Sequence, residues 1–274
     1  MCSFTIFAPE TRLIQKQLPY FMLREQVVFG PVHSRRLGSS LGINLLPENG
    51  KICTFDCIYC ECGWNRDGLG DRRLPSAAQV REALEKRLAG LDAEGGRIDS
   101  ITFSGDGEPT LNPDFPQIIE DTLALRDRFF PQAKVSVLSN ATRVHIAEVF
   151  EALRKVDNPI LKIDAPTDAL VELIDRPAPG YRLARVIEAL RRFEGDFVLQ
   201  TMFLKCSYFD SSAPECLNGW MDIVRDLRPR EIMVYTLDRP SPEEGLESFT
   251  EEQMRSLVRP LLDEGFRIQI KGKS

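Results

Sequence analysis

The chain has 274 residues, of which 43% are hydrophobic, and a formal net charge of -6 at pH 7. This length allows one large hydrophobic core, and the acidic balance argues against broad nonspecific adhesion to nucleic acid, which depends on a basic surface. No apolar stretch approaches the roughly 18 residues that cross a bilayer, and residues 1–17 lack the basic and apolar regions of a signal peptide. We therefore expect a soluble, cytoplasmic protein with no membrane partner.

Short apolar runs alternate with amphipathic helical patterns along the chain. This alternation is typical of repeated β-α units and a parallel sheet. It predicts strands at residues 42–46, 100–103, 135–138, 160–163, 197–203 and 231–235, and a terminal strand at 267–270. The helices between them are predicted at residues 76–89, 115–129, 146–156, 183–193, 217–226 and 251–264. Thr250 and Gln253 form a capping box at the start of the last helix.

Three cysteines follow the first predicted strand. Cys53, Cys57 and Cys60 have the spacing C-x3-C-x2-C and come shortly after the apolar run GINLL. Three thiolates from one short loop can hold three irons of a [4Fe-4S] cube, and the absence of a fourth protein ligand leaves one iron open to another molecule. An open iron indicates chemistry in addition to electron storage.

Other uses of the cysteines remain open at this point. A zinc site could recruit Cys62 as a fourth thiolate, although structural zinc usually pairs two short hooks from separate segments. A disulfide framework needs an oxidising compartment and usually a small, cysteine-dense domain, whereas this chain has seven cysteines in 274 residues. Cys206 and Cys216 could ligate an auxiliary centre, but scattered thiols are more often ordinary buried side chains, and we predict that they are not ligands.

The motif C-x3-C-x-aromatic-C, with Tyr59 as the aromatic residue, resembles the signature of radical S-adenosylmethionine (radical SAM) enzymes. The resemblance implies two cofactors, a [4Fe-4S] cluster and S-adenosyl-L-methionine (SAM). It implies that the open iron chelates SAM, that an electron from the reduced cluster cleaves SAM to methionine and a 5'-deoxyadenosyl radical, and that this radical takes hydrogen from a substrate. An external electron donor of flavodoxin or ferredoxin type would then be a partner.

The same resemblance implies a fold. It predicts an α/β protein with a partial (β/α)6 TIM-like barrel at residues 26–274, preceded by an N-terminal extension at residues 1–25 and ending in the additional strand. In such barrels the loops at the C-terminal ends of the strands surround the active site. We therefore expect the functional residues of this chain at those strand ends.

The second predicted strand leads into SGDGEPTL, which is similar to the GGE-type motif that binds the amino group of SAM in the family. Gly105 and Gly107 lack a Cβ, which lets the backbone approach a ligand, and Glu108 supplies a carboxylate for an ammonium group. Asp106 is an insertion relative to GGEP, so either glycine could make the contact. Without the cysteines, such a glycine-rich segment would be interpreted as a turn.

Polar residues also end the later strands. Ser139 and Asn140 are predicted near the ribose or carboxylate of SAM, although a β-α turn explains them equally. Side chains alternate along a strand, so Lys162 and Asp164 share a face that we expect to border a polar cavity, unless it is a solvated strand end. Further candidate contacts with adenine and ribose are Gln200, beside Met202, and Tyr235, beside Thr236.

Three further segments resemble the branch of iron-sulfur oxidoreductases related to wyosine-type tRNA-modifying enzymes. They are GPVHSRRLGSSLGINLLP, ahead of the cysteines, and the Arg-Pro elements at residues 174–177 and 236–240. Guanidinium groups suit phosphate or carboxylate, so we hypothesise an anion-binding rim made of Arg35, Arg36, Arg176 and Arg239. Solvated surface arginines are the alternative.

The substrate stays open among three classes: a tRNA base, a protein or peptide as in glycyl-radical activases and peptide maturases, and a small metabolite. The negative net charge and the absence of an evident RNA-binding appendage weaken the hypothesis of a tRNA substrate, so nucleic acid is a partner that we do not favour. An anionic substrate fits the hypothesised arginine rim. A non-enzymatic alternative is an iron-sulfur module that senses redox state.

Overall fold

The computed structural model describes residues 26–34, 37–48, 50–68 and 72–272. Within these ranges, one 8-stranded sheet has the order β1-β2-β3-β4-β5-β6-β9-β11. Strand β1 is antiparallel to β2, and every other neighbouring pair in this sheet is parallel. The strands are β1 (Val28–Ser34), β2 (Gly38–Ile43), β3 (Ser100–Phe103), β4 (Lys134–Ser139), β5 (Asn158–Lys162), β6 (Val198–Met202), β9 (Glu231–Tyr235) and β11 (Ile268–Lys271).

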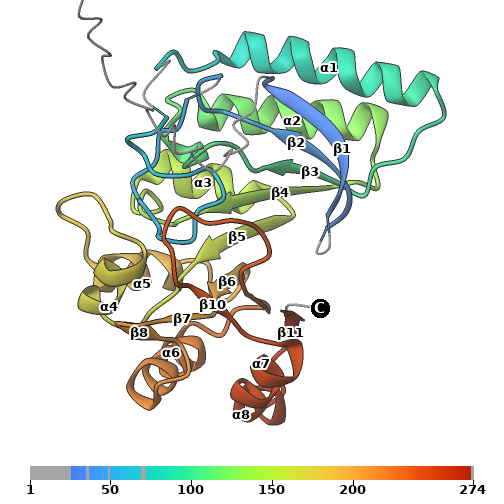
Figure 1. Cartoon of the computed structure of the whole chain (residues 1–274). Helices are drawn as coiled ribbons and strands as arrows, with labels where there is room; N and C mark the ends of the chain where they lie inside the picture. Colours follow the sequence, from blue (N-terminus) through green and yellow to red (C-terminus); the bar gives the residue numbers. More distant parts are fainter. Residues whose placement is uncertain (1–25, 35–36, 49, 69–71, 273–274) are drawn as a thin grey trace, which may run out of the picture.

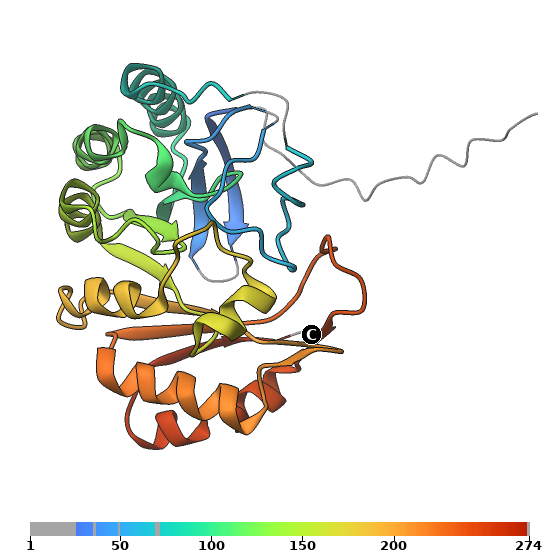
Figure 2. The same ribbon diagram turned by 90° about the vertical axis from the view of Figure 1, so that its left-hand side faces the viewer.

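Helices cover the outer side of this curved sheet (Figures 1 and 2). The sheet starts at β1 and ends at β11, so it is a curled, open half-barrel, as the predicted fold class requires. None of the described helices is both long enough and apolar enough to span a bilayer. The helices are α1 (Ala77–Ala93), α2 (Phe115–Phe129), α3 (Ala147–Lys155), α4 (Asp168–Ile174), α5 (Leu183–Arg191), α6 (Pro214–Leu227), α7 (Glu251–Leu257) and α8 (Arg259–Asp263).

The alternation of side chains on the strands separates the two faces of the sheet. On β3, Ile101 and Phe103 belong to the large core cluster that includes residues of the outer helices. The hydroxyls of Ser100 and Thr102 point the other way and join a buried network, in which Ser40 Oγ lies 2.7 Å from Thr102 Oγ1 and Ser100 Oγ lies 3.1 Å from Ser136 Oγ. Hydroxyl groups therefore fill the inside of the half-barrel at β2 to β4.

The predicted first strand, residues 42–46, is displaced from the observed β2 (Gly38–Ile43). Leu45 and Leu46 are buried but lie in the loop that follows, where Asn44 N donates to Val27 O at 2.7 Å. The apolar run therefore indicated burial and not strand pairing. The predicted strands 100–103 and 231–235 coincide with β3 and β9.

The predicted last helix, residues 251–264, is divided at Val258 into α7 and α8. Pro260 has no N–H to donate to the preceding turn, so the first helix cannot continue regularly through it. The capping box of Thr250 and Gln253 is present at the start of α7.

Several short elements were not predicted. Helix α4 and strand β1 are among them, together with a small sheet in the order β10-β7-β8. Proline inside an apolar run argues against a strand, yet β1 contains Pro31, which an edge strand with an irregular register tolerates. The small sheet comprises β7 (Leu204–Cys206), β8 (Phe209–Asp210) and β10 (Glu247–Ser248), and a 3-10 helix, η1, spans Pro109–Leu111.

Substitution of Trp220, on α6, tests how much the packing of the helices against the sheet stabilises the fold. It is 2% exposed, its ring contacts Phe203 edge-on at 5.3 Å between centroids, and its Nε1 donates to Thr201 Oγ1 at 3.0 Å. Trp220→Ala should lower the free energy of unfolding by about 3–5 kcal/mol, because it removes a large buried side chain and leaves a cavity. Urea denaturation measures this change. Tyr208→Ala is the control, since Tyr208 is 44% exposed. A loss of unfolding free energy of similar size in this variant would contradict the conclusion that the burial of Trp220 causes the effect.

Candidate active site

The cysteine loop, residues 52–60, is joined to the loop after β3 by main-chain hydrogen bonds. Ile52 N donates to Asp106 O at 3.2 Å, and Glu108 N donates to Ile52 O at 3.1 Å. Gly107 has a φ of +139°, and a Cβ on it would lie 1.9 Å from Ile52 O. The contact therefore requires glycine at this position for packing between two protein loops.

The end of α4 holds the other side of the cysteine loop. Asp56 N donates to Asp175 O at 2.8 Å, and Ile58 N donates to Ile174 O at 2.9 Å. The buried Asp175 carboxylate also accepts from Cys57 Sγ at 3.2 Å and from Tyr59 OH at 2.8 Å. The first Arg-Pro element, residues 174–177, thus contributes main-chain and carboxylate contacts that position the cysteines.

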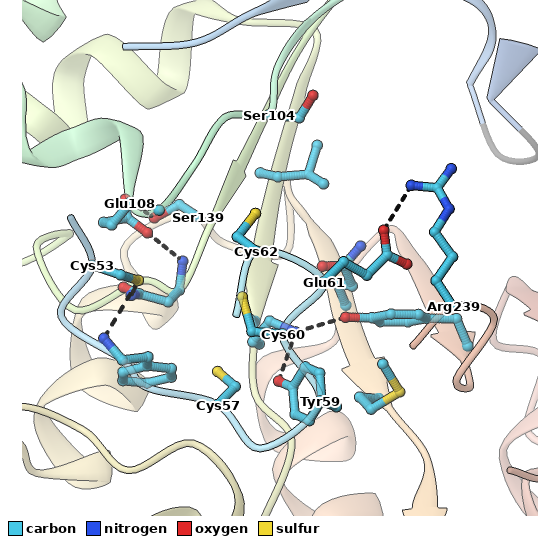
Figure 3. A pocket seen from close by; sticks show the side chains of 18 of the residues that line it. Cys53, Cys57, Tyr59, Cys60, Glu61, Cys62, Ser104, Glu108, Ser139 and Arg239 are labelled. Carbon is cyan, nitrogen blue, oxygen red and sulfur yellow. Dashed lines mark hydrogen bonds and ion pairs between the residues drawn. The ribbon is translucent and has the colours of Figure 1, made fainter. Parts of the chain in front are cut away.

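These loops and the strand ends surround a cavity of about 280 Å³ (Figure 3). It lies at the C-terminal ends of the strands, where the barrel architecture predicts the site. Of the residues proposed from the sequence as cluster or SAM contacts, only Asp164 is absent from the cavity lining. Those that line it are Cys53, Cys57, Tyr59, Cys60, Gly105, Gly107, Glu108, Ser139, Asn140, Lys162, Gln200 and Tyr235.

The thiols differ in their surroundings. Burial raises the pKa of Cys53 to about 12, while a hydrogen bond from the Cys62 thiol and the nearby Lys51 ammonium lower the pKa of Cys60 to about 6. Cys53 Sγ accepts from Phe55 N at 3.4 Å and from Asn140 Nδ2 at 3.6 Å. Donors aimed at a sulfur suit its thiolate form, which is the form that binds metal.

Lys51 is a residue of the site that the sequence analysis missed. It is 4% exposed, lines the cavity, donates to Gly63 O and lies 3.7 Å from Asp56 Oδ1. Burial opposes its charge, but the thiols and Asp56 outweigh burial and raise the pKa of Lys51. Its position two residues before Cys53 carries no sequence signal by itself, because a lysine beside a loop is usually solvated.

Glu108 is buried at 2% exposure and almost saturated with donors. Its Oε1 accepts from Thr110 N at 3.1 Å, from Thr110 Oγ1 at 2.6 Å and from Ser139 Oγ at 2.8 Å. Its Oε2 accepts from Asn140 N at 2.7 Å. Burial raises the pKa of Glu108, and these hydrogen bonds oppose that rise. The residues after β3 and β4 therefore form one unit around this carboxylate.

The floor of the cavity contains a buried charged network. Lys162 Nζ donates to Tyr235 OH at 2.7 Å and to Tyr59 OH at 3.1 Å, and lies 3.3 Å from Asp164 Oδ2. Asp164 also accepts from Tyr59 OH and from Met202 N. Lys162 and Asp164 are thus adjacent, as the alternation of side chains predicts, but Asp164 lies behind the cavity wall and positions Tyr59 and Lys162.

Two arginines of the hypothesised rim lie in the part of the chain that the structure describes, and both are ion-paired. Arg239 lines the cavity but its Nη1 lies 2.8 Å from Glu61 Oε2, and Arg176 lies outside the lining with its Nη2 3.3 Å from Glu243 Oε2. Both guanidinium groups therefore already have carboxylate partners. The other two members, Arg35 and Arg36, lie outside the described residues.

The remaining cysteines separate into two groups. Cys62 lines the cavity beside Cys60, and its Sγ lies 3.7 Å from Asp106 Oδ1. Cys206 on β7 and Cys216 on α6 belong to a hydrophobic cluster and are not part of the cavity lining. Among the described residues, no three His, Cys, Asp or Glu side chains form a site for a single metal ion.

A [4Fe-4S] cluster fits the residues that are present. Three thiols from one loop face a common cavity, a buried cation lies beside them, and two hydrogen-bond donors point at Cys53 Sγ (Figure 3). This donor set has the soft sulfur character that iron-sulfur clusters require. The cavity also has a buried carboxylate and polar strand ends for a second ligand.

Comparison with known proteins identifies the class of enzyme. Residues 50–203 match the Radical SAM superfamily, so the chain belongs to this superfamily of enzymes, whose members use a [4Fe-4S] cluster and SAM. Within it the chain belongs to the UPF0026 proteins: it is 31% identical over 221 residues to UPF0026 protein slr1464 of Synechocystis sp., covering 78% of this chain and 77% of that one.

Two other similarities agree with this assignment. UPF0026 protein MJ1312 of Methanocaldococcus jannaschii is 30% identical over 222 residues, which cover 79% of this chain and 65% of that protein. SuiB of Streptococcus suis, in its structure bound to S-adenosylmethionine, shares the fold with a TM-score of 0.59 at 15% identity, over 85% of this chain and 50% of that chain. The chain thus spans less than two thirds of each of these two proteins.

Iron content tests the assignment of the cysteines. Protein reconstituted anaerobically with iron and sulfide should hold about four irons, and Cys57→Ala should lose the cluster because it removes one of three thiolate ligands. The measurement is iron and sulfide analysis with an ultraviolet-visible spectrum.

The matched control is Cys216→Ala, a thiol that is 3% exposed but lies outside the cavity lining. It should keep about four irons, as expected for one cube. A full cluster in Cys57→Ala, or loss of iron in Cys216→Ala, would show that the cluster is held elsewhere.

Proposed function

We propose that Cys53, Cys57 and Cys60 ligate the cluster and that Glu108, with the polar residues after β3 and β4, binds the amino end of SAM. When bound, the cluster supplies the electron that cleaves SAM, and the resulting 5'-deoxyadenosyl radical removes hydrogen from the substrate. The observation that carries the proposal is the single cavity, which brings the cysteines, Glu108 and the ends of β4, β5, β6 and β9 together.

Glu108 suits an ammonium group for an electrostatic reason. Three donors occupy Oε1 and one occupies Oε2, so acceptor capacity remains on Oε2. The other hydrogen bonds stabilise the charged carboxylate, and a hydrogen bond between two charged groups in a buried site is stronger than a neutral one. Glu108 would thereby orient SAM toward the cysteines without losing its structural contacts.

Lys51 and the floor network would prepare the remainder of the site. A set of three thiolates concentrates negative charge in a buried place, and the buried Lys51 ammonium offsets part of it. Lys162 holds the Tyr59 and Tyr235 hydroxyls at fixed positions along the floor. We propose that this rigid floor, with Gln200 on the neighbouring strand, contacts the adenosine part of SAM and excludes water from it.

The substrate would enter beside Leu237 to Arg239, where the cavity lining contains both acidic and basic groups. Glu61, Asp238 and Lys271 line the cavity together with Arg239, which pairs with Glu61. Such a mixed surface fits a polar or zwitterionic group better than a polyanion, which favours a small molecule or a peptide over RNA. SuiB has been observed with its precursor peptide SuiA, and a peptide is therefore one substrate class that we propose to test first.

Substitution of Glu108 tests the SAM assignment. Glu108→Gln should weaken SAM binding by about tenfold or more and slow the formation of 5'-deoxyadenosine by the dithionite-reduced protein, because the amide carries no charge to attract an ammonium. Isothermal titration calorimetry and chromatography of the cleavage product measure the two effects.

The matched control is Glu61→Gln, which lines the same cavity but pairs with Arg239 at its mouth. This variant should bind SAM as the unaltered protein does. Iron content and thermal unfolding of both variants separate a binding effect from a folding defect, since the amide also loses the acceptor of Asn140 N. Unchanged SAM affinity in Glu108→Gln would remove Glu108 from the cofactor site.

A further inference from the structure

A second cavity, of about 220 Å³, lies behind the cysteine loop. Three segments form it: Thr54 of the cysteine loop, the loop between β4 and α3, and the segment from Pro177 through the first turns of α5. The proposed function uses none of this cavity apart from its shared wall. It therefore requires a separate explanation.

The charge of this cavity is of one sign. Arg143, Arg182 and Arg185 line it together with His145, and no aspartate or glutamate is part of its lining. In a chain with a formal net charge of -6, three guanidinium groups around one cavity without an acidic lining residue form a local positive field.

These three arginines also lack the ion pairs that other arginines of the protein make. Arg143 Nε donates to Thr110 O at 3.0 Å and Arg182 Nη1 donates to Tyr181 O at 2.7 Å, both main-chain carbonyls. None of the ion pairs of the described part of the chain involves Arg143, Arg182 or Arg185. By contrast, Arg191, also on α5, lies 2.8 Å from Asp226. The lining therefore retains guanidinium N–H groups for a ligand.

Two threonine hydroxyl groups add to the polar lining. Thr54 Oγ1 and Thr142 Oγ1 lie 2.8 Å apart at the wall next to the main cavity. Asn140 Nδ2 donates to Thr54 Oγ1 at 2.8 Å and approaches Cys53 Sγ at 3.6 Å, so the wall is continuous with the cluster loop. A ligand in the second cavity would thus contact the residue that follows the first cysteine.

We propose that this second cavity binds the phosphate group of a small phosphorylated molecule through Arg143, Arg182 and Arg185. Planar guanidinium groups match the geometry of phosphate oxygens. Three of them around one anion suit the higher negative charge of a phosphate better than the single charge of a carboxylate. The site is distinct from the SAM cavity, and binding there does not depend on the proposed function because it requires no cleavage of SAM.

The probe for the experiment is inorganic pyrophosphate, titrated calorimetrically into the reconstituted holoprotein at about 50 mM salt, where exposed charges are weakly screened. Saturating S-adenosylhomocysteine fills the main cavity, so the heat reports on the second one. A second titration with adenosine 5'-diphosphate measures whether an organic group on the phosphate raises the affinity. If adenosine 5'-diphosphate binds more tightly than pyrophosphate, the result supports a phosphorylated metabolite as the ligand. Equal affinities of the two probes support a site that contacts the phosphate group alone.

The arginine variants assign the site. Arg185→Gln should weaken pyrophosphate binding by about tenfold or more, the loss expected for one charge-assisted contact, and Arg143→Gln should do the same. Arg191→Gln is the matched control on the same helix, and Arg239→Gln is the control for the main cavity. Neither control should change the affinity.

Three outcomes would overturn the proposal. One is the absence of saturable pyrophosphate binding, and another is an equal loss in Arg191→Gln or Arg239→Gln. The third concerns unmodified tRNA, titrated between 50 and 200 mM salt: tight binding that falls by about 10³ or more over this range, together with no binding of pyrophosphate, would make these arginines part of an RNA surface.

Discussion

The position of the cysteine loop depends on main-chain hydrogen bonds to two neighbouring segments. Residues of this loop form no regular strand or helix, yet Ile52 is joined to the loop after β3 and Asp56 and Ile58 are joined to the end of α4. Side chains on such a loop would otherwise sample many arrangements, and ordering them costs conformational entropy. The fold bears that cost, and the three thiols face one cavity.

The half-barrel divides its interior between structure and chemistry. Hydroxyls of Ser40, Ser100 and Ser136 fill the inside near the start of β2 to β4, and Ile160, Val198 and Met233 fill it beside them. The charged and polar side chains of the cavity occur two to four residues later, at the strand ends. Because each strand of a parallel sheet points the same way, every unit contributes its loop to the same edge, and one cavity collects residues distant in sequence.

Much of this arrangement could be predicted from local patterns. The motif of Cys53, Cys57 and Cys60 resembles the radical SAM signature, and that resemblance implied the enzyme class and the half-barrel, while the alternation of apolar runs with amphipathic segments predicted the parallel sheet. Lys51 and Asp175 could not be predicted, because their significance depends on neighbours from other units. The ion pairs of Arg239 and Arg176 could not be predicted for the same reason, since their partners Glu61 and Glu243 are distant in the chain.

Gly105 and Gly107 have a packing role that the sequence motif did not predict. Gly105 and Gly107 were expected to let the backbone approach SAM, and both line the cavity. A Cβ on Gly105 would lie 2.0 Å from Asn44 Oδ1, and one on Gly107 would meet the backbone of Ile52. Protein packing alone therefore demands their small size, a requirement that sequence spacing cannot distinguish from ligand binding.

The segment that follows β9 also contacts the cysteine loop, since Glu243 N donates to Ile58 O at 3.2 Å. About two thirds of the chain separates these two residues, so this contact closes a very long loop and cannot form until the segment after β9 has been synthesised. On the ribosome the cysteines therefore emerge long before the segment that completes their enclosure. During that interval the thiols lack this part of their enclosure, and exposed thiols are more susceptible to oxidation than buried ones.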